Sequence, residues 1–320
     1  MSTLDLYHNC RLCPRDCGVD RFASSDGLCG ESAELRVAFA GLHRGEEPPL
    51  SGMGGSGTIF ISGCNLGCAM CQNWQVSSGI GKERLGRAVS TDEFSAMCFA
   101  LQNSGAENIN FVTGSHAVPA IVQGLEAAKA AGLRIPVLWN SSAYESPAAL
   151  ELLGDYVNTW LPDLKTLDSA LAVRFFNATD YPQAAVRAIQ WMIQHGGLPA
   201  ASSMTLSGKL PGIVIRHLML PGYLESTRTV LRWFADNAAG KAQLSLMSQY
   251  TPIARDGAGP MPGRFLSERE YDTVLGWLGE LGIDDGFCQD YITGNDWLPD
   301  FKRHNPFSSE LSVTVWHFAG

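Results

Sequence analysis

The sequence of 320 residues predicts an α/β fold on a parallel sheet, either doubly wound or rolled toward a barrel. Two observations lead to this prediction. Six short apolar segments with the character of buried strands alternate with amphipathic helical segments over about 200 residues. Capping residues, Gly and Pro mark the ends of the helical segments. Such alternation indicates right-handed crossovers, and both architectures place chemistry at the carboxyl ends of the strands.

The predicted strands are rich in Val, Ile, Leu and aromatic residues, and turn-forming residues flank them. They are residues 57–62, 108–113, 135–140, 156–162, 212–220 and 242–248. The order of these segments along the chain makes 57–62 the first strand of the sheet.

The helices between the strands are predicted from their ends. Ser90 and Glu93 form a capping box at the start of one helix, and Gly132 ends the next. Pro182 and Gly196 fit the first turn and the end of a later helix. The predicted helical segments are residues 90–105, 117–132, 146–154, 181–197 and 225–240.

Composition and charge exclude several classes of protein. With 45% hydrophobic and 17% charged residues, the chain has a globular composition. A formal charge of -9, without a run of Lys and Arg, argues against a nucleic-acid partner. The amino terminus lacks a signal-peptide pattern and no stretch of about 18 apolar residues occurs, so we expect a cytoplasmic protein without membrane contact. In the reducing cytosol, its nine cysteines are expected to serve metal or redox chemistry.

Three cysteines follow the first predicted strand in "SGCNLGCAMCQNW": Cys64, Cys68 and Cys71. They therefore lie at the carboxyl end of that strand, where a site is expected. Three thiolates can bind three irons of a cubane cluster and leave the fourth iron open, whereas ordinary electron-transfer clusters take four cysteines. The alternatives are scattered structural thiols or a zinc site completed by a distant Cys or His.

A second cluster of cysteines lies near the amino terminus. Cys10, Cys13, Cys17 and Cys29 fall within twenty residues, separated by Gly, Pro and Asp. A segment this small needs a metal or an equivalent crosslink to fold. Four thiolates form either a structural zinc site or a fully ligated auxiliary iron-sulfur cluster, and the short C-x2-C spacing favours zinc.

The C-x3-C-x2-C spacing resembles the signature of the radical SAM superfamily. From about residue 8 to residue 290 the chain looks like PflX-type proteins, which are relatives of pyruvate formate-lyase activating enzyme. The matching stretches are "CRLCPRDCGVDR", "EEPPLSG", "GSGTIFISGCNLGCAMCQNW", "NFVTGSH", "WNSSAYES", "LPDLK", "IRHLMLPG" and "LMSQYTP". The resemblance implies a partial (β/α)6 barrel of the radical SAM type at residues 56–285. A cysteine-rich metal-binding module precedes it at 1–55, and a tail at 286–320 packs on the barrel.

The resemblance also implies an activity. A 4Fe-4S cluster on Cys64, Cys68 and Cys71 would bind S-adenosylmethionine (SAM) at its open iron. The chain would then be a radical SAM oxidoreductase that cleaves SAM reductively to a 5'-deoxyadenosyl radical and abstracts hydrogen from a substrate. A glycyl radical enzyme is the leading substrate, and the alternative substrates are another peptide or a small metabolite. The alternative to an enzyme is that the chain is a non-catalytic iron-sulfur or zinc protein. A flavodoxin or ferredoxin would donate the electron.

Site residues carry over from the family onto the strand ends. Thr113, Gly114 and Ser115 are expected to hold the SAM amino group, and Asn140 and Ser141 to supply oxygen ligands. Asp163 is expected to help bind a monovalent cation, and Lys165 and Arg216 to pair with carboxylates. Met70 and Gln249 are expected to contact adenine or ribose. Outside this set, alternation along the strand predicts that His217 faces out of the barrel. Glu46 and Glu47 are interpreted as a solvated acidic turn.

Overall fold

The computed structural model describes residues 2–77, 84–196, 204–205, 208–253 and 261–320. Within these residues, six strands run parallel around the site. They are β2 (Ser56–Ile61), β4 (Ile109–Val112), β5 (Val137–Ser141), β6 (Thr159–Pro162), β9 (Val214–Leu218) and β10 (Gln243–Met247). All six overlap segments predicted as strands, and only β2 and β5 extend beyond them, by one residue each. The order β2, β4, β5, β6 forms one sheet, and β9 and β10 pair in a second.

Two parallel bridges join these sheets between β6 and β9. Trp160 pairs with Ile213, and Asp163 pairs with Arg216. The six strands therefore form the partial (β/α)6 barrel that the sequence predicted. Antiparallel strands extend it at one edge, and the sequence analysis did not predict them: β1 (Leu35–His43) lies between β2 and β12 (Ser312–His317), and β3 (Arg87–Val89) pairs with β1.

The described part of the chain contains three further short strands. β11 (Gly286–Cys288) runs parallel to β10 in the second sheet, and β7 (Met204–Thr205) pairs with β8 (Gly208–Lys209) in a separate two-stranded sheet. β1 belongs to the segment assigned to the N-terminal module, and β12 belongs to the predicted tail. The division of the chain at residues 55 and 285 remains a proposal.

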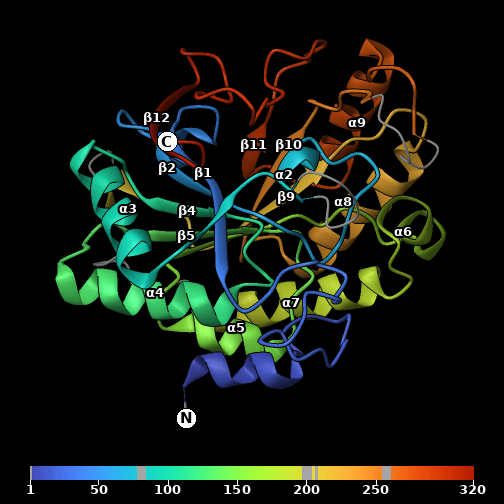
Figure 1. The fold of residues 1–320 in the computed structure, drawn as a ribbon. Helices are drawn as coiled ribbons and strands as arrows, with labels where there is room; N and C mark the ends of the chain where they lie inside the picture. Colours follow the sequence, from blue (N-terminus) through green and yellow to red (C-terminus); the bar gives the residue numbers. More distant parts are fainter. Residues whose placement is uncertain (1, 78–83, 197–203, 206–207, 254–260) are drawn as a thin grey trace.

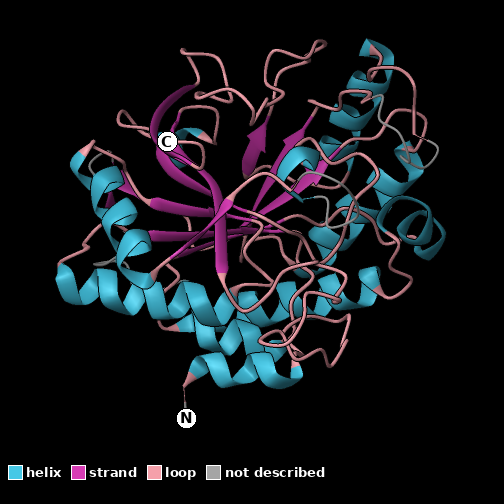
Figure 2. Ribbon diagram, in the orientation of Figure 1, coloured by secondary structure: helices cyan, strands magenta, loops and turns pink. Residues whose placement is uncertain are grey.

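Helices such as α4, α5 and α7 cover the outer face of the sheets (Figures 1 and 2). The helices of the described residues are η1 (Thr3–Asn9), α1 (Pro48–Ser51), α2 (Trp74–Ser77), α3 (Thr91–Asn103), α4 (Val118–Ala131), α5 (Pro147–Gly154), α6 (Ser169–Phe176), α7 (Tyr181–His195), α8 (Leu224–Asn237) and α9 (Glu268–Glu280). The Ser90–Glu93 capping box forms as predicted, and Gly132 takes the left-handed conformation that ends α4. Among the described helices, none is long and apolar enough to cross a membrane.

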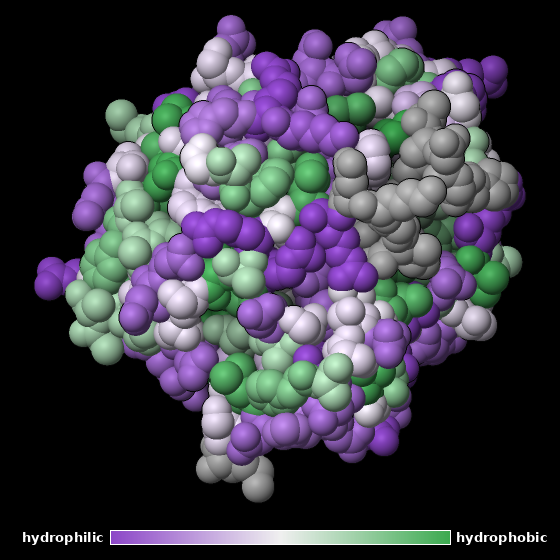
Figure 3. Space-filling view, viewed as in Figure 1, coloured by the Kyte–Doolittle hydropathy of each residue, from purple (hydrophilic) through white to green (hydrophobic). Residues whose placement is uncertain are grey.

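Aromatic side chains fill the space between the sheet and its covering layers. Phe94 of α3 stacks on Phe111 of β4, with ring centroids 5.7 Å apart. On another part of the sheet, Phe60 packs against Phe301 and Phe307 of the C-terminal segment, which lies at the opposite end of the molecule from η1 (Figure 1). Figure 3 shows that hydrophilic residues lie across the middle of the face seen in that view. The packing fixes the strand ends that carry the site.

Candidate functional site

A cavity of about 230 Å³ opens at the carboxyl ends of the parallel strands. All three cysteines of the loop after β2 line it. So do residues that follow or end the other strands, and these include Thr113, Asn140, Ser141, Asp163, Leu218 and Met247. Residues from distant parts of the chain meet here because parallel strands end at one edge of a barrel.

The cysteine loop is held in place by several polar contacts. The Leu66 N–H donates to the Cys64 sulfur at 3.4 Å, and the Cys71 sulfur lies 3.1 Å from the Ser77 hydroxyl. Burial raises the pKa of Cys64, and the neighbouring Cys71 adds to the effect. Without a metal the Cys64 thiol keeps its proton, whereas bound iron would take it as a thiolate.

The donor set suits an iron-sulfur cluster better than a single ion. In the described residues, no group of three or more His, Cys, Asp or Glu side chains is arranged to hold one metal ion. Each cysteine of a cubane cluster binds a different iron, so its sulfurs need not converge on one point. Three thiols around one cavity, within a single short loop, fit that requirement.

Most of the residues predicted to contact SAM line the same cavity. They are Met70, Thr113, Asn140, Ser141, Asp163, Lys165, Arg216 and Gln249. Gly114 and Ser115 do not line it, because the chain turns away from the cavity after Thr113. Other lining residues were not predicted: Gln72, Asn73, Ser77, Ser142 and Phe176. Gln72 and Asn73 follow the last cysteine directly, and Ser77 lies six residues after it, so proximity to Cys71 was the available signal.

Thr113 has an unusual backbone conformation at this edge. Its φ is 62°, in the left-handed region that β-branched residues rarely adopt. The Thr113 N–H donates to the Asn140 carbonyl at 3.0 Å, which fixes the end of β4 against β5. Such strain persists where surrounding structure imposes it, and it is concentrated at functional sites.

Gly114 and Ser115 pack behind the cavity. A Cβ atom at Gly114 would lie 2.7 Å from the Trp139 ring and 2.8 Å from Ile121. The Ser115 hydroxyl donates to the buried Glu145 carboxylate at 2.6 Å. The Ser115 hydroxyl is thus already bonded to Glu145, and the expectation that Gly114 and Ser115 help to hold the SAM amino group stays a prediction.

Gly114→Ala is expected to destabilise the protein by about 1–3 kcal/mol, because the added methyl overpacks a rigid contact. Trp139 and Ile121 are fully buried, so neither can easily move aside. Urea denaturation measures the loss, and SAM affinity under conditions where the variant is folded should remain close to wild type. Unchanged stability would contradict this packing role.

Asp163 and Lys165 form an ion pair inside the cavity. Lys165 Nζ lies 2.6 Å from Asp163 Oδ2, and both side chains are 23% exposed. Tyr181 supports the pair: its hydroxyl donates to the Asp163 carbonyl and accepts from the Lys165 N–H. Burial favours the neutral amine, but Asp163 together with Cys68 and Tyr181 outweighs burial and raises the pKa of Lys165. Lys165 is therefore a fixed cation at the site.

Arg216 also lines the cavity, but its guanidinium has carboxylate partners already. Its Nη2 contacts both Glu46 and Glu47, and its Nε donates to Glu47 at 2.9 Å. The Glu46 and Glu47 side chains are only 11% and 8% exposed. The interpretation of a solvated acidic turn was wrong: this turn enters the barrel, and its acids neutralise Arg216. Because Arg216 still lines the cavity, its expected role in binding the SAM carboxylate stays a prediction.

His217, next along β9, faces the helices, as predicted. Its Nδ1–H donates to the Leu164 carbonyl at 2.7 Å, and its Nε2 accepts from the Thr227 hydroxyl of α8 at 3.0 Å. Burial lowers the pKa of His217 from 6.5 to about 4. The imidazole is therefore neutral at physiological pH.

Acidification should destabilise the fold through His217. Because the folded pKa lies below the unfolded one, the unfolded state binds the proton first, and stability is lost as pH falls from 6.5 toward 4. The loss is about 3 kcal/mol. Urea midpoints measured across this range should fall less steeply for His217→Asn, and equal slopes would contradict the assignment.

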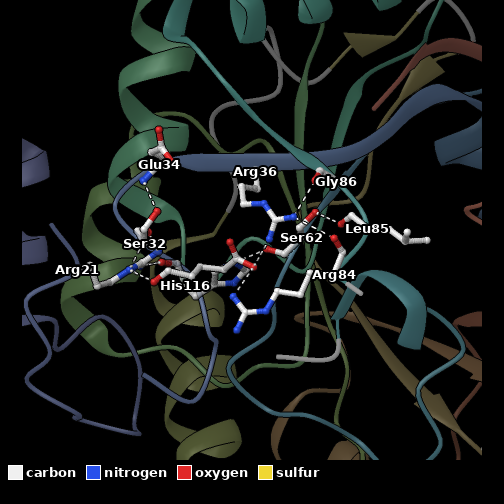
Figure 4. A network of polar contacts seen from close by, with 10 residues as sticks. Arg21, Ser32, Glu34, Arg36, Ser62, Arg84, Leu85, Gly86 and His116 are labelled. Atoms are coloured by element: carbon white, nitrogen blue, oxygen red, sulfur yellow. Dashed lines mark hydrogen bonds and ion pairs between the residues drawn. The ribbon is translucent and has the colours of Figure 1, made fainter. Parts of the chain in front are cut away.

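A buried polar network lies behind the start of the cysteine loop (Figure 4). The His116 Nε2–H donates to the Ser62 carbonyl at 2.7 Å, and the Ser62 hydroxyl donates to the Leu85 carbonyl. Burial and the nearby Arg21 lower the pKa of His116 to about 3, so the ring is neutral. The carboxylate of Glu31 lies 3.3 Å from Arg36. This network fixes the backbone just before Cys64.

The N-terminal cysteines lie beside one another. A Cβ atom at Gly27 would be 3.5 Å from the Cys17 sulfur and 3.7 Å from the Cys29 sulfur. Burial raises the pKa of Cys13 to about 12, with smaller contributions from Cys10 and Cys29. Among the described residues, these thiols are not arranged to hold a single metal ion. The four sulfurs would therefore have to move closer together to bind zinc.

The comparison with protein families decides the class. The model of the Radical SAM superfamily matches residues 58–233, which is more than half of the chain. The chain belongs to the Radical SAM superfamily. Members of this superfamily use a 4Fe-4S cluster and SAM, so membership implies radical SAM chemistry and a low-potential electron donor such as flavodoxin or ferredoxin.

Alignments with similar proteins cover most of the chain. An uncharacterized protein of Methanocaldococcus jannaschii is 26% identical over 282 residues, which cover 88% of this chain and 77% of the relative. Among solved structures, Streptococcus suis SuiB is 13% identical with a TM-score of 0.48, and it is matched over 71% of this chain and 47% of its own. The maturase HydG of Carboxydothermus hydrogenoformans is 14% identical with a TM-score of 0.49, over 72% and 52%. This radical SAM chain thus spans about half the length of those two.

Proposed function

We propose that this radical SAM chain binds a 4Fe-4S cluster through Cys64, Cys68 and Cys71, and binds SAM in the adjoining cavity. The observation that supports this is the position of all three thiols on one cavity at the carboxyl ends of the strands. When both cofactors are bound, they supply one-electron cleavage of SAM to methionine and a 5'-deoxyadenosyl radical. The protein's part is to bind, orient and exclude water.

The lining residues have distinct parts in this proposal. The oxygens of Thr113, Asn140 and Ser141 are acceptors that suit the SAM ammonium group. Lys165, held by Asp163, is a cation that lines the cavity and suits a carboxylate. Apolar side chains complete the wall and exclude water from a reactive radical; they are Val112, Phe176, Leu218, Leu220 and Met247.

For the substrate we infer a glycyl radical enzyme, from which the chain would remove a hydrogen atom at a backbone glycine. The support is the resemblance of "NFVTGSH", "LPDLK" and "IRHLMLPG" to PflX-type proteins. Modification of another peptide or of a small metabolite uses the same cavity and is the competing substrate class. A glycyl radical enzyme incubated anaerobically with the chain, SAM and a reductant should acquire the doublet of a carbon-centred radical in its electron paramagnetic resonance (EPR) spectrum.

The first test of the proposal is metal and product analysis. Protein purified without oxygen is assayed for iron, sulfide and zinc, then reduced with dithionite in the presence of SAM. About four irons per chain and formation of 5'-deoxyadenosine are expected. About eight irons would assign a second cluster to the N-terminal cysteines. No iron and no product would contradict the proposed function.

Cys13→Ala tests the second metal site, which we propose to be zinc held by Cys10, Cys13, Cys17 and Cys29. Because a structural metal contributes folding free energy directly, the variant should bind less zinc and melt at a lower temperature. 5'-Deoxyadenosine formation below its melting temperature should persist. An unchanged melting temperature with lost activity would indicate an auxiliary cluster instead.

A further inference from the structure

Arg15 connects the N-terminal cysteine segment to the loop that carries Cys64. Its Nε donates to the Asn65 carbonyl at 2.9 Å, and its Nη2 donates to the Leu66 carbonyl at 3.2 Å. The same guanidinium reaches the end of α6, where Nη1 donates to the Asn177 carbonyl at 2.6 Å and Nη2 to the Phe176 carbonyl at 3.3 Å. One side chain therefore joins three parts of the fold through four carbonyls.

This arginine has no carboxylate partner among the residues that the structure describes. It differs in this respect from Arg216, whose charge two glutamates neutralise. The carbonyls at the end of α6 carry the negative end of the helix dipole, which favours a cation there. The positive charge of Arg15 consequently remains uncompensated by acidic side chains, and it lies against the two residues that follow Cys64.

The backbone before Cys64 is held from the same N-terminal segment. A Cβ atom at Gly63, whose φ is 85°, would lie 2.4 Å from Glu31 Cγ, so Glu31 packs directly on this glycine. Arg21 donates to the carbonyls of Glu31 and His116, and His116 in turn holds Ser62. Figure 4 shows Arg21 and His116 together on one side of Ser62. Contacts from residues 15–31 thus fix the chain on both sides of Cys64.

We propose that Arg15 is a positioning residue for the cluster site: it sets the geometry of the Cys64–Cys71 loop and supplies a positive charge beside it. This inference rests on the proposed cluster. Contacts that orient ligands commonly change metal affinity about 10–100-fold when removed. A nearby positive charge stabilises the more negative, reduced form of a cluster, because net charge is one determinant of its potential.

Arg15→Ala and Arg15→Lys separate the two effects. Alanine removes both the four donors and the charge, whereas lysine keeps the charge without the planar fork. The matched control is Arg11→Ala, which removes an exposed arginine from the same segment, where it pairs with Asp16. Each variant is reconstituted anaerobically. The measurements are the rate of iron loss to a chelator, the midpoint potential from an EPR-monitored redox titration, and the melting temperature.

We expect Arg15→Ala to lose iron about 10-fold faster than wild type and to have a more negative midpoint potential. Arg15→Lys should lose iron faster but keep a midpoint potential close to wild type, and Arg11→Ala should match wild type in both. If Arg15→Ala only lowers the melting temperature, with wild-type iron loss and potential, Arg15 is merely structural and the inference is wrong. Equal effects in Arg11→Ala would also overturn it. A wild-type chain that binds no iron would instead refute the proposed function.

Discussion

Cys68→Ala is expected to abolish 5'-deoxyadenosine formation and to leave the chain folded. Cys68 lines the cavity between Cys64 and Cys71, and with two thiols left the loop could not hold three irons. The fold should survive because Cys68 lies in a loop at the barrel edge and contributes a single partly buried thiol to the packing. A loss of product without a loss of structure is therefore the predicted signature of a cofactor ligand.

The measurement is anaerobic iron analysis followed by chromatography for 5'-deoxyadenosine after dithionite reduction with SAM. Cys288→Ala provides the matched control, because Cys288 is an exposed cysteine of β11 outside the cavity. It should keep wild-type iron and product. Circular dichroism establishes that both variants are folded. Product from Cys68→Ala at the wild-type level would refute the assignment of the loop to the cluster.

The six barrel strands could be predicted because their sequences are unambiguous. Each is a short apolar run between turn residues, and the helices between them carry clear ends, such as the Ser90–Glu93 capping box. The loop with Cys64 followed from the same reasoning, since strand order alone places it at the site edge. The features that depend on local sequence, namely the barrel strands, the helix ends and the position of the cysteine loop, were therefore predicted correctly.

The edge strands were not predicted, for a physical reason. β1 follows an irregular cysteine-rich segment, and its partner β12 lies about 270 residues later in the chain. Antiparallel pairing over that distance depends on tertiary contacts, such as those of Phe39 with Phe307, rather than on local pattern. The sequence around β12 alternates in the manner of a strand, but nothing local indicates which strand it joins.

Side-chain partners within the site also lay beyond the sequence. Arg216 is a plausible ligand for a carboxylate on chemical grounds, yet nothing in its own strand indicates that Glu46 and Glu47 enter the barrel from 170 and 169 residues away. Similarly, "TGSH" does not reveal that the chain turns after Thr113 and buries Ser115 against Glu145. The residue types at the strand ends indicated correctly where the site lies. Which of these side chains face the cavity depends on tertiary packing, which the sequence does not show.

Arg216→Met should lower the free energy of unfolding by about 3–5 kcal/mol at pH 7.5, because it leaves buried carboxylates without their cation. Glu46 and Glu47 are nearly inaccessible to water, so solvent cannot replace the guanidinium. A variant that also removes the two carboxylates gives the control. In the triple variant Arg216→Met with Glu46→Gln and Glu47→Gln, neutral amides remove the unpaired charges, and part of the lost stability should return.

The pH dependence of this loss makes the prediction sharper. Burial alone would raise the pKa of Glu47, but Arg216 outweighs it and holds that pKa below the ordinary 4.5. In wild type, the stabilisation is therefore present above about pH 4.5 and is lost as pH falls further. In Arg216→Met, burial is unopposed at Glu47, so its carboxyl takes up a proton at higher pH, which relieves part of the unpaired charge. Urea denaturation should show that the stability gap between the two proteins narrows from pH 7.5 to pH 5. A gap below about 1 kcal/mol at pH 7.5, the size of an exposed pair, would refute the buried pairing.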